Sequence, residues 1–506
     1  MSMANCQYGY DTSTIGGFQA MVGFLQVFGY KDSSRDIGWN IGTKPQQLIS
    51  SFLNVGTIIG VLLTGPFARF FGRRPAIWLA SLVSGVAAGI QVGTTSLAGL
   101  YAGRILMGAS NGFFITFANT YTAEASPAHL RGVIVSFFGI WVNMGSLLGS
   151  IANNFSQKHV NKYSYQIPLA TIFAIPLFLS IFVVFIPESP RWLLVQGRNE
   201  EARRALQRLR GDSLKPQYFE EEIVEMTRGI EREKELAESG AFLDMFRGTN
   251  LRRTLLCVAV TVSHTTSGLW LLIAYGTFLF QMAGIDRAFE TSVYKDIGGL
   301  VGTAVGMYFM MHLWGRRTMM CFGTAAAGLA MLGIAVSYTV GGPESAVAGK
   351  AILAFTLMYE FFYNGWSGTI SWPVAEELVS SRLRVFTIGK STAINYFFSW
   401  LVTYTTPYYI NKEQLNWGGK YAYIWAGSNA ITFVVFILFL PEMRGRSLEE
   451  IDELFENRVS VLDFPKYQCI SSMQAREIAG TAVGDEKGEG TSVENETAAV
   501  EDRQNM

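Results

Sequence analysis

Apolar stretches of about twenty residues alternate with short charged clusters along most of the chain. An α-helix needs ~20 residues to cross about 30 Å of hydrocarbon. We read twelve such spans, near residues 4–28, 46–66, 75–95, 99–121, 133–153, 166–187, 254–280, 294–312, 317–338, 350–373, 387–409 and 420–440. The pattern predicts an all-α membrane protein with twelve transmembrane helices in two groups of six.

The composition agrees with repeated membrane spans. Of the 506 residues, 49% are hydrophobic and 16% are charged, whereas a soluble domain has about 25% charged residues. The net charge of zero speaks against nucleic-acid binding. Asp11 interrupts the first apolar stretch, so we expect no cleavable signal peptide.

No arrangement typical of an enzyme or a metal site appears in the sequence. The four cysteines lie far apart without a CxxC spacing, which argues against a metal site and against a disulfide framework. The chain has no GxxxxGK(S/T) phosphate loop and no nucleophile–base spacing. We therefore expect no enzyme activity, no cofactor and no metal.

Basic residues cluster after spans 2, 4, 8 and 10, which puts them on one side of the membrane. They are Arg69, Arg73, Arg74, His129, Arg131, Arg316, Arg317, Arg382, Arg384 and Lys390. The positive-inside rule makes this side cytoplasmic, and an even number of spans leaves both termini there. A sequon at Asn154 falls between spans 5 and 6 on the outer side, where a glycan can be added. The sequon at Asn495 lies in the cytoplasmic tail and should stay unmodified.

The spans divide the chain into two bundles, a linker and a tail. We place the N-terminal six-helix bundle at residues 1–187 and the C-terminal bundle at residues 251–456. Residues 188–250 mix acidic and basic side chains at helical spacing, which indicates short cytoplasmic helices. Residues 457–506 are poor in aromatics and end in a Gly/Glu/Thr-rich stretch, so we expect a disordered cytoplasmic tail.

The two bundles share short motifs at equivalent places. RFFGRR at residues 69–74, after span 2, recurs as HLWGRR at residues 312–317, after span 8. PESPR at residues 187–191, after span 6, recurs loosely as PEMRG at residues 441–445, after span 12. Matching motifs in two six-span halves indicate a duplicated transporter with a site between the halves.

These motifs resemble those of the sugar porter family of the major facilitator superfamily, over about residues 8–456. The resemblance also rests on GYDT at 9–12, PAHLRG at 127–132, WLL at 192–194 and GR at 445–446. The stretch 377–384, with WG at 417–418 and WAG at 425–427, is similar to the fungal disaccharide and α-glucoside branch. The resemblance implies the major facilitator fold, in which two pseudo-symmetric bundles close alternately over a central site.

Asp11 and Arg104 are charged residues inside predicted spans 1 and 4. A carboxylate in hydrocarbon costs ~2.5–3.5 kcal/mol, so it usually faces an interior cavity and marks a pathway. The resemblance implies that this Asp and Arg form a proton-coupling pair, in which Asp11 takes up a proton outside and releases it inside. The alternative is a structural ion pair that fixes helices 1 and 4.

Arginine and glutamate residues at the cytoplasmic helix ends are candidates for a gate. They are Arg73, Glu124, Arg131, Glu188, Arg191, Arg316, Glu377, Arg384 and Glu442. Pairs among them would hold the inner face shut and break when it opens; the alternative is ordinary positive-inside topology with solvated charges. The family usually has Asp three residues before the loop Gly. This chain has Arg69 and His312 there, so an acidic partner is missing from both halves.

Aromatic and polar residues in spans 1, 7 and 10 are candidates for a substrate site, because sugars stack on aromatic faces and hydrogen-bond through their hydroxyls. They are Tyr8, His264, Thr265, Trp270, Tyr275, Glu360, Trp366 and Trp372. Trp372 matches the family's tryptophan in span 10. Membrane aromatics also serve in packing, and His264 or Glu360 would equally suit a bond between helices.

The family's span-7 motif QQxSGxN reads HTTSGLW at residues 264–270, and its span-5 Gln falls on Gly139. The amides that hold hexose hydroxyls are therefore missing at these positions. The substitutions favour a disaccharide, a modified sugar or a less polar metabolite over plain glucose.

The combined reading is a monomeric secondary active transporter of a sugar or glycoside, working by alternating access with proton symport, in the lipid bilayer of the plasma membrane. Two alternatives stay open: a facilitator or exporter of a non-sugar metabolite, and a sugar sensor without transport. Only ten residues precede Asp11, so we expect that span 1 lacks much of its cytoplasmic half.

Overall fold

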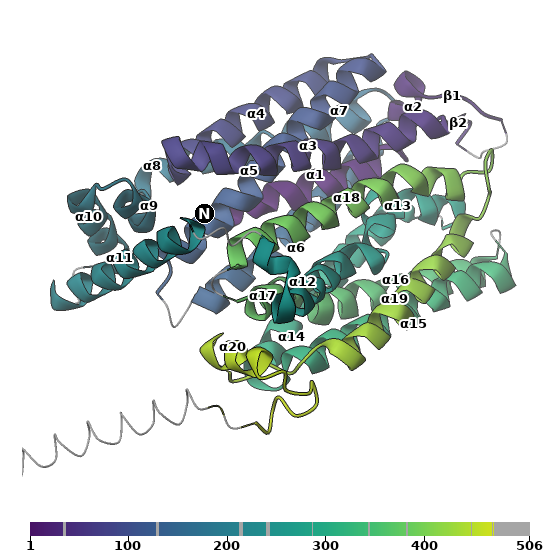
Figure 1. The fold of residues 1–506 in the computed structure, drawn as a ribbon. Coiled ribbons are helices and arrows are strands. Elements are labelled where there is room, and N and C mark those ends of the chain that lie inside the picture. Colours follow the sequence, from purple (N-terminus) through teal and green to yellow (C-terminus); the bar gives the residue numbers. More distant parts are fainter. Residues whose placement is uncertain are drawn as a thin grey trace, which may run out of the picture.

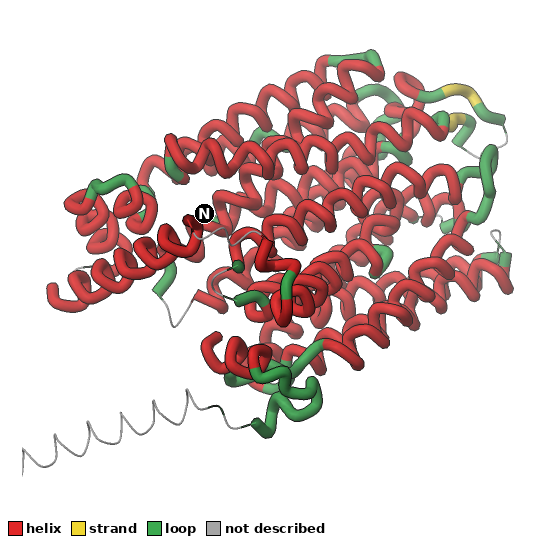
Figure 2. Tube along the Cα trace, in the orientation of Figure 1, coloured by secondary structure: helices red, strands yellow, loops and turns green. Residues whose placement is uncertain are grey.

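The computed structural model describes residues 1–33, 37–127, 131–211, 216–238, 243–285, 287–342, 345–380, 383–446, 448–467 and 469. The described chain is almost entirely helical (Figure 2). Its helices form two bundles that lie side by side. The N-terminal bundle, purple to blue, lies in the upper part of Figure 1, and the C-terminal bundle, teal to yellow, in the lower part.

Six helical passes form the N-terminal bundle. Its elements are η1 (Ser2–Ala4), α1 (Asn5–Phe18), α2 (Val22–Phe28), α3 (Thr43–Phe71), α4 (Arg73–Gly93), α5 (Leu97–Ala125), α6 (Arg131–Ser156), α7 (Tyr163–Thr171) and α8 (Ala174–Phe185). The sixth pass is α7 together with α8. The prediction that span 1 is one helix over residues 4–28 is wrong, because the chain leaves the helix between α1 and α2.

Six further passes form the C-terminal bundle. Its elements are α12 (Gly248–Thr266), α13 (Leu269–Met282), α14 (Ala288–His312), α15 (Arg316–Gly341), α16 (Ala346–Phe362), η3 (Tyr363–Gly368), α17 (Thr369–Leu378), α18 (Arg384–Ile410), η4 (Gly418–Tyr421) and α19 (Ala422–Phe439). Pass 7 is α12 with α13, and pass 10 runs from α16 through η3 to α17.

Within the described residues, eight passes are long and apolar enough to cross a membrane by length and composition alone. The other four are α1, α5, α14 and α18, which are shorter or carry more polar side chains. Polar membrane helices usually face a bundle interior or a water-filled cavity. The fold is the predicted all-α, twelve-helix architecture.

Two passes of the C-terminal bundle are irregular where they meet the centre of the protein. Gly268 has φ +89°, a left-handed conformation that favours glycine, and it separates α12 from α13. In pass 10, η3 is a π-helical turn. Such turns are frequent at functional sites, because they shift the side chains of one face relative to the regular helix.

The two bundles meet mainly along three helix pairs, α1 with α13, α3 with α18, and α6 with α14, and α6 also contacts α17. Gly16 permits the first contact, because a Cβ atom there would lie 2.4 Å from the carbonyl oxygen of Ile273. Directly after α18, Asn411 Nδ2 donates to Gln46 Oε1 of α3 at 2.9 Å. Both residues of this last bond lie near the end of the protein that carries the hairpin described next.

A small hairpin and several short helices lie at opposite ends of the molecule (Figure 1). The hairpin, which the sequence did not predict, pairs β1 (Tyr30–Lys31) with β2 (Trp39–Asn40). At the other end lie α9 (Pro190–Val195), α10 (Asn199–Arg210), α11 (Pro216–Glu238), η2 (Leu243–Phe246) and α20 (Leu448–Glu456). The charged linker is therefore helical, as predicted.

The tail is partly ordered just after α20. Val461 and Phe464 are buried, and Arg446 Nη2 donates to the carbonyl oxygens of Phe464 and Tyr467. The prediction of disorder over residues 457–506 is therefore wrong for this first part. Most of the remaining tail lies outside the described residues.

Candidate functional site

A polar cavity lies on the seam between the two bundles. It encloses about 950 Å³ of empty space, counting its opening. The N-terminal bundle contributes α1 and α6 to its wall, and the C-terminal bundle contributes its irregular passes 7 and 10 together with α14 and α18. The lining residues that carry the argument below are Tyr8, Asn143, His264, Trp270, Lys295, Asp296, Glu360, Tyr363, Asn364, Trp372, Asn395 and Tyr396.

One side of the cavity is aromatic. The rings of His264 and Trp372 lie 5.4 Å apart at an interplanar angle of 35°, and Trp270 lines the wall nearby. Both ring nitrogens of His264 are used: Nδ1 lies 2.7 Å from the Tyr363 hydroxyl and Nε2 bonds Ser371. His264 therefore ties α12 to pass 10, and its hydrogen bonds fix the orientation of an aromatic wall.

A second group of lining residues is charged or carries amides. Lys295 Nζ lies 3.2 Å from Asp296 Oδ1 and 3.7 Å from Glu360 Oε1. Asn364 Nδ2 donates to Glu360 Oε2 at 2.8 Å. Asn143 of α6 donates to Asn364 Oδ1 at 3.4 Å, across the seam. Amide groups therefore reach the cavity from other positions than the family motif would supply.

The structure separates the eight candidate substrate residues into two groups. Five line the cavity: Tyr8, His264, Trp270, Glu360 and Trp372. The other three, Thr265, Tyr275 and Trp366, are buried away from it and make packing contacts or structural hydrogen bonds. Their assignment to the substrate site is therefore withdrawn.

Each of the three withdrawn residues has a structural partner. Thr265 Oγ1 donates to Asn395 Oδ1 at 2.8 Å. The Tyr275 hydroxyl donates to the backbone carbonyl of Thr403 at 2.7 Å. Trp366 sits among aromatic rings of α14, α15 and α16, with Phe309 and Phe322 at centroid distances of 5.6 and 5.5 Å.

Sequence reasoning missed several lining residues, among them the charged Lys295 and Asp296. The predicted span began at residue 294, which placed both charges at the membrane surface. The helix actually begins at Ala288, so the charges lie about two turns inside it. Glu290 is an acidic residue in the first turn of this helix, and it was the sequence signal that could have placed the helix start correctly.

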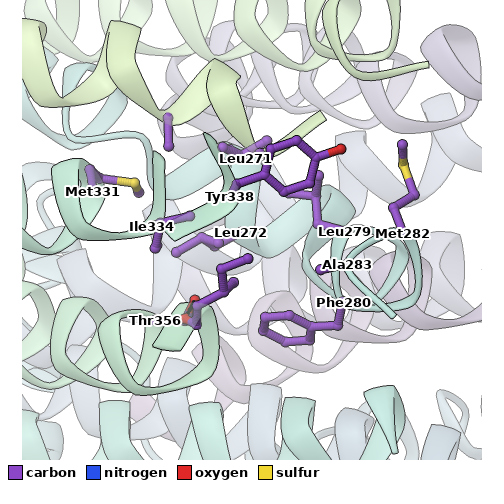
Figure 3. A pocket seen from close by; sticks show the side chains of 13 residues that line it. Leu271, Leu272, Leu279, Phe280, Met282, Ala283, Met331, Ile334, Tyr338 and Thr356 are labelled. Atoms are coloured by element: carbon purple, nitrogen blue, oxygen red, sulfur yellow. Dashed lines mark hydrogen bonds between the residues drawn. The ribbon is translucent and has the colours of Figure 1, made fainter. Parts of the chain in front are cut away.

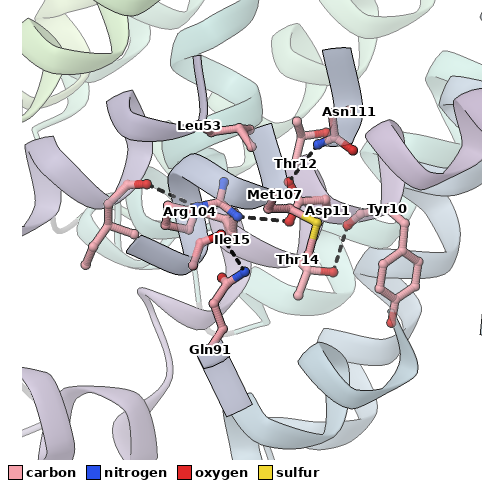
Figure 4. Close-up of polar contacts among 12 residues, drawn as sticks. Tyr10, Asp11, Thr12, Thr14, Ile15, Leu53, Gln91, Arg104, Met107 and Asn111 are labelled. Atoms are coloured by element: carbon pink, nitrogen blue, oxygen red, sulfur yellow. Dashed lines mark hydrogen bonds and ion pairs between the residues drawn. The ribbon is translucent and has the colours of Figure 1, made fainter. Parts of the chain in front are cut away.

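Asp11 and Arg104 form the predicted pair inside the N-terminal bundle (Figure 4). The carboxylate Oδ1 lies 2.9 Å from Arg104 Nη1, and both side chains are fully buried. Asn111 Nδ2 donates to Asp11 Oδ2 at 3.2 Å, and Arg104 Nε donates to the Ile49 carbonyl oxygen at 3.3 Å. The pair lies behind the cavity wall, one helical turn from Tyr8.

The candidate gate residues build the same cluster in each bundle. In the N-terminal bundle, Arg73 pairs with Glu124 at 2.7 Å, and Glu188 accepts the backbone N–H of Arg73 at 3.0 Å. Both bonds join elements of the N-terminal bundle, and neither reaches the C-terminal bundle.

In the C-terminal bundle, Arg316 pairs with Glu377 at 3.1 Å, and Glu442 accepts the backbone N–H of Arg316 at 2.7 Å. The two clusters repeat the same donors and acceptors at equivalent helix ends. As they stand, these bonds do not connect the bundles, so their role in gating stays a prediction.

The remaining predicted site residues lie at the ends of helices. Arg191 is in the first turn of α9, and the side chain of Arg131 lies outside the described residues. Nε and Nη2 of Arg384 are buried and make no hydrogen bond within the described part of the chain. Asn154 lies in the last turn of α6, where its Oδ1 accepts from Gln157 Nε2 at 2.9 Å, rather than in the predicted loop.

A second cavity lies within the C-terminal bundle, among α13, α15 and α16 (Figure 3). Its wall is formed mainly by aliphatic and aromatic side chains, such as Leu272, Phe280 and Ile334. Its polar side chains are Tyr338 and Thr356, few for the recognition of a hydrophilic ligand. We regard it as a gap in helix packing.

Two repeated helical bundles with a polar cavity on their seam define a membrane transporter of the major facilitator type. The chain matches the family described as "Sugar (and other) transporter" over residues 1–455, and it belongs to that family. It is thus an integral membrane transporter and not an enzyme.

Relatives with similar sequences are fungal transporters. The chain is 29% identical to the major facilitator-type transporter ecdD of Aspergillus rugulosus, with 91% of this chain and 87% of the relative covered. It is 28% identical to the probable glucose transporter rco-3 of Neurospora crassa, with 88% and 77% covered. It is 27% identical to the hexose transporter HXT10 of Saccharomyces cerevisiae, with 89% and 83% covered.

Solved structures share the fold. The xylose transporter XylE from E. coli, in a partially occluded inward-open conformation, superposes with a TM-score of 0.72 at 20% identity, covering 88% of this chain and 97% of that one. The proton:xylose symporter XylE bound to 6-bromo-6-deoxy-D-glucose gives a TM-score of 0.71 at 21% identity, covering 90% and 97%.

Proposed function

We propose that the protein carries a sugar or glycoside across a membrane by alternating access, together with a proton. The observation that carries the proposal is the fully buried Asp11–Arg104 pair, one helical turn from the wall of a polar and aromatic cavity. A carboxylate kept at this depth needs a function or a partner that offsets its cost. Two of the relatives are named as a probable glucose transporter and a hexose transporter, which supports a sugar as the substrate.

The cavity offers two kinds of contact to a sugar. Trp270 and Trp372 present aromatic faces on which the C–H face of a pyranose ring stacks. Asn143 and Asn364 in the same lining present amides that bind hydroxyls.

Proton binding at Asp11 would loosen its bond to Arg104. A protonated carboxyl no longer attracts the guanidinium as an ion, and Arg104 keeps its hydrogen bond to the Ile49 carbonyl on α3. Helix α1, which contacts α13 across the seam, would then gain freedom relative to α5. In this proposal the proton leaves Asp11 on the cytoplasmic side, and the ion pair re-forms.

The arrangement of bonds on the seam supports an inward-facing state. Asn411–Gln46 and Asn54–Thr403 join the bundles on the hairpin side. The Arg73 and Arg316 clusters at the opposite end each stay within one bundle. We infer that these clusters keep each bundle rigid while it rocks. We also propose that the Arg73 and Arg316 clusters and both termini face the cytoplasm. The protein then works as a monomer in the plasma membrane, and Asn154 carries a glycan.

The test is uptake into proteoliposomes that contain only the purified full-length protein. Radiolabelled D-glucose, D-xylose, maltose and cellobiose would be offered with and without an inwardly directed proton gradient. Accumulation of one of these sugars that collapses with a protonophore is the expected result. Equilibration without accumulation would overturn proton coupling, and binding without flux would indicate a sensor. Movement of none of the sugars would favour the non-sugar alternative.

A further inference from the structure

The cavity contains a charged cluster whose charges do not balance. Lys295 and Asp296 of α14 and Glu360 of α16 each expose 7% or less of their surface. Two carboxylates and one ammonium sum to one excess negative charge. An uncompensated charge in such a site is costly. The cluster therefore needs one further positive charge.

The geometry indicates which of the two carboxyl groups lacks a compensating positive charge. Asp296 Oδ1 lies 3.2 Å from Lys295 Nζ, and its Oδ2 accepts a hydrogen bond from Ser150 of the other bundle. Both oxygens of Asp296 thus face donors, which suits a carboxylate.

Glu360 is less well supplied with donors. Its Oε2 accepts from Asn364 Nδ2 at 2.8 Å. Its Oε1 is buried without a hydrogen bond among the described residues and lies 3.7 Å from Lys295 Nζ, beyond hydrogen-bond distance. A carboxylic acid with its O–H on Oε1 fits this environment better than a carboxylate does.

We propose that Lys295, Asp296 and Glu360 together hold one proton, carried on Glu360 Oε1, and that the resulting carboxylic acid is a hydrogen-bond donor for an oxygen atom of a neutral sugar. This inference rests on the part of the proposed function that names a sugar as the substrate. It does not depend on proton symport. It assigns Glu360 a role distinct from Asp11: the proton stays on the cavity wall and is not the one transported.

Among the residues that the structure describes, the neighbours of Glu360 supply no other compensating cation. Lys295 is already paired, and α6 contributes Asn143 and Ser150, which do not titrate. Tyr8 of α1, Tyr363 of η3 and Tyr396 of α18 line the same cavity and are neutral phenols. Helix α15, packed against α16, has no charged residue after Arg317. His264 has both ring nitrogens engaged in hydrogen bonds with Tyr363 and Ser371.

The first test needs no substrate. Infrared spectra of the purified full-length protein at neutral pH should contain the carbonyl stretch of a buried carboxylic acid, which shifts in heavy water and which a carboxylate lacks. The band should be absent in Glu360→Gln and present in Asp11→Asn. A spectrum in which Glu360→Gln leaves the band region unchanged would overturn the proposal, whatever the outcome of the transport assays.

The second test measures affinity for D-glucose and cellobiose in detergent from about pH 5 to about pH 9, a range that brackets ordinary carboxyl and histidine titration. Wild-type affinity should fall roughly tenfold as the pH rises and the proton is lost, since each lost hydrogen bond in a binding site is worth about that factor. Glu360→Gln keeps a neutral donor and should bind well at every pH. An affinity that rises with pH, or a wild type without pH dependence, would contradict the proposal.

Asp296→Asn is the crossed control. Without Asp296, Lys295 and Glu360 balance each other, so Glu360 should become a carboxylate and lose its donor. This variant should bind weakly at every pH, like the wild type at high pH, while Glu360→Gln binds tightly. Equal behaviour of the two variants would overturn the assignment of the proton to Glu360. Monodisperse elution and an unchanged melting temperature verify that each variant is folded.

Discussion

The carboxylate of Asp11 and the guanidinium of Arg104 lie 2.9 Å apart, and neither side chain reaches the surface. This pairing links α1, which lies on the seam, to α5, which lies inside the N-terminal bundle. The pair is placed so that its making and breaking can change how α1 is held. The pair can equally act as a structural ion pair that fixes α1 to α5. The two functions predict different behaviour for variants of Asp11 and Arg104.

Replacing Asp11 by Asn should abolish concentrative uptake and leave sugar exchange intact. An amide cannot take up the proton that drives accumulation, but it still accepts a hydrogen bond from Arg104. The measurement is pH-driven uptake and counterflow in the same proteoliposomes. Thr12→Val is a matched control, because Thr12 is buried beside Asp11 and bonds only backbone carbonyls of its own helix. Concentrative uptake that survives Asp11→Asn would show that Asp11 is not the coupling group.

Replacing Arg104 by Met should destabilise the protein more than Asp11→Asn does. It leaves the Asp11 carboxylate buried without its cation, which typically costs ~3–5 kcal/mol. The double variant with Asp11→Asn removes both charges and should recover most of that loss. Thermal unfolding in detergent measures the effect. A double variant as unstable as Arg104→Met would mean that the guanidinium matters through its packing and its bond to Ile49.

Cross-linking the bundles on the hairpin side should stop transport. Gln46→Cys and Asn411→Cys place thiols on α3 and at the C-terminal cap of α18, at side chains that now share a 2.9 Å hydrogen bond. The cross-link prevents the separation that alternating access requires. The variant is made in a background whose four native cysteines are replaced by Ser.

A cross-link within one bundle is the control for this experiment. Thr266 Oγ1 and Thr432 Oγ1 lie 3.2 Å apart, and both residues belong to the C-terminal bundle. Joining Thr266→Cys to Thr432→Cys should leave transport nearly unchanged, because the bundle moves as one body. Unimpaired transport with the seam cross-linked would rule out rocking about this interface.

The twelve-helix fold could be read from the sequence because membrane spans are set by a local quantity, the length of an apolar run. The repeats at 69–74 and 312–317 then predicted equivalent clusters, and Arg73 and Arg316 occupy equivalent places. The repeat did not predict which residue each arginine pairs with. Whether an arginine pairs within its bundle or across the seam depends on how the bundles are rotated, and no local pattern encodes that rotation.

The site was harder to predict, because it depends on which face of a helix meets the cavity. Trp366 and Trp372 lie six residues apart on a pass that contains a π-helical turn. Trp372 lines the cavity and Trp366 packs into an aromatic cluster, and composition gives no hint of this division. Lys295 was missed for a different reason: an error of six residues in a helix start moved a buried charge to the surface.

Replacing the two tryptophans should separate affinity from stability. Trp372→Ala removes a cavity wall and should weaken sugar binding about tenfold or more, since stacking and apolar contact in a site contribute ~1–3 kcal/mol. Trp366→Ala empties a packed aromatic cluster and should cost ~3–5 kcal/mol of stability with little effect on affinity. Binding by intrinsic fluorescence and thermal unfolding measure the two quantities. A Trp366 variant that is stable but cannot bind would return Trp366 to the substrate site.

The two arginine clusters should contribute unequally to the rigidity of their bundles. Arg73 and Glu124 are 2.7 Å apart with about a tenth of each side chain exposed, whereas Arg316 and Glu377 are 3.1 Å apart with about a quarter exposed. Solvent screens the more exposed pair more strongly. A double-mutant cycle with Arg73→Gln and Glu124→Gln should therefore give a coupling energy of about 1–2 kcal/mol in thermal unfolding, and the cycle at Arg316 and Glu377 well under half of that. Salt should lower the second value more than the first. If both cycles gave zero coupling while transport was lost, the clusters would act in gating rather than in holding each bundle together.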